Sequence, residues 1–155
     1  VNLAKALEII PEKEFREYFG SDIGIIGKTK LKTVEELTDK IKQVVGYEVK
    51  LYRYGVKEIK DGKVALVAGG GNDPETIPQI AEFGINTFVT GITKPNKDYS
   101  PSIQAHALLK KFRINLIGTT HYSTEKFACI AMVEYFKNLG LPCEFIEGKS
   151  GLEDM

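Results

Sequence analysis

Short apolar runs alternate with helix-like segments through the second half of the chain. The predicted strands are 63–68, 86–90, 114–117 and 143–146. The helices predicted from apolar residues at helical spacing are 74–83, 103–112 and 125–139. Such alternation is typical of an open α/β sheet, mostly parallel or mixed, with helices on both faces. Within this sheet, 63–68 is expected to be a central strand, because its continuous apolar run suits burial on both faces.

The first half of the chain contains one well-marked helix, predicted at 33–45. Thr33 and Glu36 have the spacing of a capping box, and Gly46 follows the last turn. Strands are predicted at 22–28 and 48–54. In the second of these strands the side chains alternate in the way that is typical of an edge or half-exposed strand.

The start of the chain is set apart from this pattern. Residues 2–10 are predicted to form a short helix that Pro11 interrupts, whereas 14–19 favours neither helix nor strand. We therefore divide the chain into a helical segment, 1–19, and an α/β lobe, 20–155.

Composition narrows the class of protein. Apolar residues make up 43% and charged residues 27%, which is ordinary for a globular domain, and no apolar run approaches the ~20 residues of a membrane span. Twenty-one basic and 21 acidic side chains balance to zero, so nucleic acid is not an expected partner. Cys129 and Cys143 form no CxxC pair, and we interpret them as small buried hydrophobes of a cytoplasmic protein.

Two loops that follow predicted strands carry candidate binding residues, because open α/β sheets bind ligands at this edge. Gly69, Gly70 and Gly71 precede a helix, so their amides could approach an anion, although a tight turn with positive φ is the favoured explanation. Lys94 and Lys97 lie in a loop with prolines and could contact a small anionic substrate, or could face solvent.

A third loop carries the most informative residues, His121 and Glu125. We expect His121 on the turn after the 114–117 strand and Glu125 in the first helical turn. Imidazole and carboxylate suit Zn, Mn, Fe or a similar divalent ion. The alternative is a hydrogen-bonded loop histidine and a carboxylate that stabilises a helix N-terminus, and the spacing leaves both open. His106, on an apolar helix, is favoured as a surface or hydrogen-bonded core histidine.

Three motifs occur in a recognisable order: VAGGG at 67–71, Thr-Gly at 90–91 and THYSTE at 120–125. Their order and spacing resemble those of the NGG-interacting-factor-three-like proteins, a dinuclear metal-binding family also called type-two GTP cyclohydrolase-like. The opening VNLAKAL resembles that family's mid-chain helix. The chain departs from the family after Gly91, where it has Ile92, Thr93, Lys94 and Pro95 in place of an acidic residue and two histidines.

The resemblance implies that His121 binds one metal of a pair and that Glu125 binds or bridges both. Two further ligand motifs of the family, His-His-Pro and Thr-Asn-Leu-Asp, are absent from this sequence. The resemblance therefore implies that this chain is the C-terminal portion of a larger α/β protein, in which residues 1–19 join an N-terminal lobe. Two ligands leave an ion mostly hydrated, so this chain is expected to bind metal weakly. If this chain supplies further metal ligands, His106 and Asp73 are the first candidates to examine.

Two functions follow from this resemblance. The first is a metal-dependent hydrolase, homo-oligomeric, that acts on a nucleotide or phosphoester. The alternative is a non-catalytic oligomeric scaffold or a regulatory protein that binds a partner.

Overall fold

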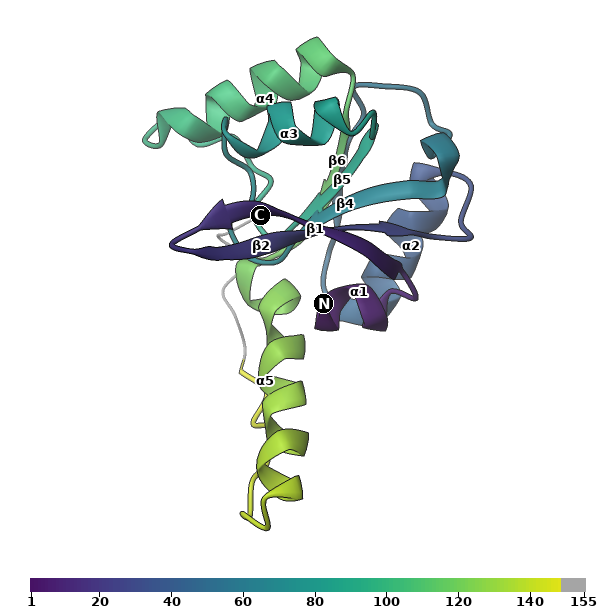
Figure 1. Ribbon diagram of the computed structural model, residues 1–155. Coiled ribbons are helices and arrows are strands. Elements are labelled where there is room, and N and C mark those ends of the chain that lie inside the picture. Colours follow the sequence, from purple (N-terminus) through teal and green to yellow (C-terminus); the bar gives the residue numbers. More distant parts are fainter. Residues whose placement is uncertain (149–155) are drawn as a thin grey trace.

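Residues 1–148, the part of the chain that the computed structural model describes, form a six-stranded sheet with helices on both faces (Figure 1). The strands are β1 (Ile10–Tyr18), β2 (Ser21–Lys28), β3 (Lys50–Tyr52), β4 (Lys63–Val67), β5 (Thr87–Thr90) and β6 (Asn115–Gly118). The helices are α1 (Asn2–Ala6), α2 (Val34–Val45), α3 (Thr76–Glu82), α4 (Ser100–Phe112) and α5 (His121–Asn138). A short 3-10 turn, η1 (Lys60–Gly62), leads into β4.

The strand order is β1-β2-β4-β5-β6-β3. Strands β4, β5 and β6 run parallel, while β1, β2 and β3 join them through antiparallel pairs. The expected α/β sheet is thus confirmed in its mixed form, with the parallel strands in the middle. β4 is central as predicted, and the strand predicted at 48–54 is shorter and lies at an edge.

Successive side chains of a strand point to opposite faces of the sheet, so the buried apolar residues form one cluster on each face. Val64 and Leu66 of β4 join one apolar cluster, which α1 and α2 cover. Ala65 and Val67 join the other, which α3 and α4 cover. The predicted placement of helices on both faces is therefore confirmed, and Figure 1 shows the two layers.

Helix α2 forms as its capping residues predict. The Thr33 hydroxyl accepts a hydrogen bond from the Glu36 amide at 3.2 Å, and the Glu36 carboxylate accepts one from the Thr33 amide at 3.4 Å. Gly46 ends the helix in the left-handed conformation. The apolar stripe of α2 is buried, so the helix covers one face of the sheet.

The helical prediction for 1–19 is wrong beyond α1. Residues Ile10–Tyr18 form β1, an antiparallel edge strand that pairs with β2. Only Phe15 of this strand is fully buried, so the strand needs few apolar residues. Its sequence therefore lacks the alternation of apolar and polar residues that would mark a half-buried strand. Pro11 also disfavours helix at the residue before it, and α1 ends at Ala6.

Helix α5 begins at His121 and extends away from the sheet (Figure 1). Thr120 caps it, because its hydroxyl accepts a hydrogen bond from the Ser123 amide at 3.1 Å. The prediction of a start near residue 125 misses this cap. Ser123 and Thr124 are the buried residues of the helix.

The C-terminal predictions are corrected by the structure. Residues 143–146 form no strand; the segment returns beside α5, where Lys126 Nζ lies 2.9 Å from Glu147 Oε1. Cys129 is exposed and Cys143 half-buried, so their interpretation as buried hydrophobes is wrong. The last residues assigned to the lobe, 149–155, lie outside the described part.

No helix within residues 1–148 combines the length and apolarity needed to cross a membrane.

Candidate metal centre

His121 and Glu125 lie one turn apart at the start of α5, so both side chains occupy the same face of the helix. His121 Nε2 is 2.9 Å from Glu125 Oε1. The side chains are 41% and 52% exposed, which leaves their donor atoms accessible. The structure therefore brings the two predicted ligands together, although His121 belongs to the helix rather than to the preceding turn.

The backbone of Gly69 lies directly against this pair. A Cβ built on Gly69 would be 2.3 Å from Glu125 Oε1 and 2.8 Å from His121 Nε2. Its φ of +72° also lies in the region that favours glycine. The positive φ of its turn therefore favours glycine at position 69, and the ends of the His121 and Glu125 side chains occupy the space that a Cβ would take.

Two buried threonines fix the loop that contains Gly69. The Gly69 amide donates to Thr124 Oγ1 at 2.9 Å, and the Gly71 amide donates to Thr90 Oγ1 at 2.9 Å. Thr90 Oγ1 donates in turn to the Gly69 carbonyl at 3.0 Å. The Gly69 and Gly71 amides are therefore engaged within the protein, and Gly70 is the member of the predicted anion-binding trio that borders the neighbouring hollows.

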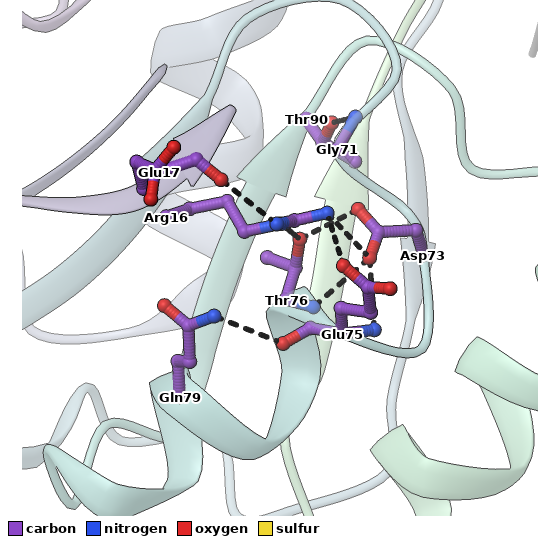
Figure 2. Close-up of polar contacts among 8 residues, drawn as sticks. All are labelled: Arg16, Glu17, Gly71, Asp73, Glu75, Thr76, Gln79 and Thr90. Atoms are coloured by element: carbon purple, nitrogen blue, oxygen red, sulfur yellow. Dashed lines mark hydrogen bonds and ion pairs between the residues drawn. The ribbon is translucent and has the colours of Figure 1, made fainter. Parts of the chain in front are cut away.

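Arg16 anchors the same loop from β1 (Figure 2). Its guanidinium lies 2.9 Å from Glu75 Oε2 and 3.6 Å from Asp73 Oδ1, and Nε donates to Thr76 Oγ1 at 3.1 Å. Asp73 Oδ1 also accepts from the Glu75 amide at 2.8 Å and from the Thr76 amide at 3.0 Å, so it holds the turn that leads into α3. Asp73 is therefore engaged in structural contacts.

Two adjoining hollows open at this edge of the sheet. The first, of about 590 Å³, is bordered by Arg16, His121 and Glu125. The second, of about 650 Å³, is bordered by Lys94 and Lys97. Both volumes fall within the range of small-molecule sites. The structure thus places the predicted lysines beside the His121–Glu125 hollow rather than inside it.

His106 is a hydrogen-bonded core histidine, as the sequence favours. Its Nδ1 lies 2.8 Å from the Tyr54 hydroxyl and its Nε2 lies 2.6 Å from the Thr93 carbonyl. Burial lowers the pKa of His106, the Thr93 carbonyl opposes this, and Lys110 adds to the lowering. The ring is therefore held neutral, with Nε2 donating to Thr93.

The free energy of unfolding is expected to fall as the pH drops below His106's ordinary pKa of 6.5. The unfolded chain takes up this proton first, so stability due to neutral His106 is present above pH 6.5 and is lost towards the lowered folded pKa. Because a single proton is involved, the free energy of unfolding can change by no more than about 1.4 kcal/mol per pH unit. Urea unfolding between about pH 7.5 and about pH 5.5, roughly one unit either side of 6.5, measures this change in the free energy of unfolding.

In this experiment His106→Gln should reduce the slope, while His121→Gln, at an accessible histidine, serves as the control. Equal slopes in wild type and His106→Gln would contradict the assignment.

The donor set of the described residues fits one edge of a metal centre. His121 and Glu125 converge on accessible atoms, and Gly69 keeps the adjacent space free of a Cβ. Within residues 1–148 no group of three or more His, Cys, Asp or Glu side chains could hold an ion. Catalytic metals usually take about three protein ligands, so further donors are needed to complete the centre.

Sequence reasoning misses the residues that support this site. Thr90 and Thr124 lie within the quoted motifs but are assigned no role. The signal for each is its position, beside a strand-end glycine for Thr90 and one turn into a helix for Thr124, where the hydroxyl can reach a backbone amide of a neighbouring loop. Arg16 carries no such signal, because only the β1–β2 pairing brings it to Asp73.

Comparisons with known proteins agree with this architecture. A "GTP cyclohydrolase 1 type 2 homolog" of Archaeoglobus fulgidus is 28% identical over 139 residues, which is 88% of this chain and 50% of that protein. A protein of the same name from Borreliella burgdorferi is 32% identical over 125 residues, which is 79% of this chain and 44% of that protein. The chain spans about half the length of these curated relatives.

Solved structures share the fold. HcgD from Methanocaldococcus jannaschii matches with a TM-score of 0.65 and 21% identity, over 88% of this chain and 50% of that one. A Thermus thermophilus protein matches with a TM-score of 0.68 and 22% identity, over 97% of this chain and 54% of that one. The family model for Duf34/NIF3 (NGG1p interacting factor 3) matches residues 1–150. The chain therefore belongs to the Duf34/NIF3 family.

Proposed function

We propose that this chain supplies His121 and Glu125 to a dinuclear centre of divalent metal ions, Zn, Mn or Fe. The observation that carries the proposal is the 2.9 Å approach of His121 Nε2 to Glu125 Oε1 directly over the Cβ-free backbone of Gly69. Glu125 has two carboxylate oxygens and can contact both ions, whereas the imidazole binds one. The remaining ligands are proposed to come from residues outside these 155.

The proposed activity is hydrolysis of a nucleotide or phosphoester. When bound, the metal ions supply Lewis-acid chemistry and make a water molecule a nucleophile near neutral pH. In this chain, His121 and Glu125 would hold the ions, and Thr90 and Thr124 fix the loop beside these two side chains. Relatives named as GTP cyclohydrolase homologs support a nucleotide as the class of substrate.

A metal titration tests this proposal. The 155-residue chain alone is expected to bind Zn²⁺ or Mn²⁺ at least about 100-fold more weakly than the full-length gene product, since even outer-sphere partners change metal affinity by about 10–100-fold. Calorimetry on both proteins measures the ratio. Equal affinities would show that the ligands are not divided in the way we propose.

A second candidate function, an oligomeric scaffold, is favoured by the surface of α5. Met132, Tyr135 and Leu139 are 54%, 62% and 58% exposed and follow the i, i+3, i+7 spacing of one helical face. Exposed apolar surface of this kind is typical of protein interfaces. A protein that binds metal and a specific partner but hydrolyses no nucleotide or phosphoester would favour this scaffold over the hydrolase.

Met132→Glu is expected to weaken self-association at least tenfold, because it places a carboxylate on the apolar face of α5 (about 1.4 kcal/mol or more). Sedimentation velocity over a concentration series measures the association. Lys137→Gln, which makes the same change in charge elsewhere on the helix, is the matched control. A wild-type protein that stays monomeric would contradict the scaffold proposal.

A further inference from the structure

The hollow beside the His121–Glu125 pair has the features of a ligand subsite. It encloses about 650 Å³ between the loop after β4 and the loop after β5. Its polar lining includes Asn72, Lys94, Asn96, Lys97, Asp98 and Tyr99. It shares Gly70, Asp73 and Tyr99 with the hollow that contains His121 and Glu125. One small molecule could therefore extend from one hollow into the other.

Asn72 contributes a buried acceptor to this hollow. The residue is 4% exposed and lines the hollow, and its Nδ2 donates to the Thr93 carbonyl at 3.4 Å. Its Oδ1 has no hydrogen-bond partner among the described residues. Buried acceptors in native proteins are almost always paired with protein or with water, so this oxygen has the capacity to accept a hydrogen bond from an N–H or O–H donor of a ligand or from a water molecule.

The lysines are the positively charged groups in the lining of the hollow. Neither Lys94 nor Lys97 forms an ion pair with a residue in the described part of the chain. Of the two carboxylates in the lining, Asp73 is paired with Arg16, which leaves Asp98 against the two lysines. Because Arg16 also pairs with Glu75, the charges around the hollow balance, and it is the two unpaired lysine side chains, rather than a net charge, that favour an anionic ligand.

The loop that carries these lysines is braced by internal hydrogen bonds. The Ser102 hydroxyl accepts from the Asn96 amide at 2.8 Å and donates to the Tyr99 carbonyl at 2.8 Å. Ser102 is itself 3% exposed. The lysines therefore extend from an ordered turn at the start of α4.

We propose that this hollow binds a small phosphorylated molecule. Lys94 and Lys97 bind the phosphate, and Asn72 Oδ1 accepts a hydrogen bond from an N–H or O–H group of the same molecule. The rest of the ligand then reaches His121 and Glu125 through the shared border. The reaction at that end rests on the proposed function, whereas binding to Asn72 and the lysines needs no metal.

Calorimetry on the full-length protein, freed of metal with EDTA, tests this subsite. The probes are AMP, GMP, ribose 5-phosphate and inorganic phosphate. Replacing both lysines (Lys94→Gln with Lys97→Gln) is expected to weaken every probe that binds by at least about tenfold, because hydrogen bonds to charged groups are the strong ones. Asn72→Leu is expected to weaken the organic phosphates about tenfold and to leave inorganic phosphate within twofold.

Controls separate these effects from misfolding and from the metal proposal. Lys111→Gln with Lys137→Gln removes the same charge elsewhere, and Asn72→Ala replaces Asn72→Leu if the latter lowers the melting temperature. Absence of saturable binding of all four probes, or binding that survives loss of both lysines, would overturn the subsite. An organic phosphate that binds the Asn72 variants as it binds wild type would overturn the role of Asn72. Loss of metal binding alone would leave the subsite intact.

Discussion

Full-length protein carrying Glu125→Ala is expected to bind Zn²⁺ or Mn²⁺ at least about 100-fold more weakly than wild type. The substitution removes one of the two convergent donor groups and the partner of His121 Nε2. Outer-sphere partners already account for about 10–100-fold in metal affinity, so a direct ligand is expected to reach or exceed the upper value. Alanine is a strong helix former, so α5 should persist. Competition with a chelator of known affinity measures the loss.

Glu134→Ala is the matched control for Glu125→Ala, because Glu134 is an exposed carboxylate on the same helix. It should leave the affinity for metal within about twofold, since exposed charges have small effects. Equal losses in the two variants would mean that the negative charge of α5, rather than a ligand, attracts the ion.

Gly118→Ala is expected to lower the free energy of unfolding by about 3 kcal/mol, the upper part of the range for overpacked cores. A Cβ at this position would lie 2.2 Å from the Thr90 carbonyl oxygen and 2.3 Å from Thr93 Cγ2. The first contact is with backbone of the neighbouring parallel strand, which cannot rotate away as a side chain can. Urea unfolding should show a lower midpoint with little change in slope.

Gly70→Ala tests whether close approach, rather than loss of a glycine, causes the destabilisation by Gly118→Ala. A Cβ on Gly70 would lie no nearer than 3.5 Å to Ile92 Cδ1, an ordinary contact. This variant should therefore change the free energy of unfolding by no more than about 0.5 kcal/mol. A destabilisation as large as that of Gly118→Ala would show that the loss of a glycine, rather than the close approach of Thr90 and Thr93 to Gly118, accounts for the effect.

The parts of the fold that follow from sequence are those with strong periodic or capping signals. The capping box of Thr33 and Glu36 predicts α2, and the apolar run at 63–68 predicts the central strand β4. Strand β1 lacks such a signal, because it lies at an edge and buries only Phe15 fully. The residues predicted as a final strand, 143–146, lie beside α5 instead, while β1 and β3 form the two edges of the sheet.

The sequence identifies the two candidate metal-binding residues of the site but not the residues that support them. His121 and Glu125 carry a spacing that indicates chemistry, and the structure brings their side chains together. Arg16 and Asn72 reach this edge through tertiary contacts, which no local pattern records. The same limit explains Lys94 and Lys97, whose loop gives no sign of the neighbouring hollow that they border.

The most direct test of the proposed centre is anomalous X-ray diffraction from crystals of the full-length protein grown with Zn²⁺. We predict an anomalous peak about 2.0–2.2 Å from His121 Nε2 and from a carboxylate oxygen of Glu125, with a second ion about 3.5–4 Å away. A structure in which zinc binds elsewhere, while His121 Nε2 remains paired with Glu125 Oε1, would contradict the assignment of these residues as metal ligands.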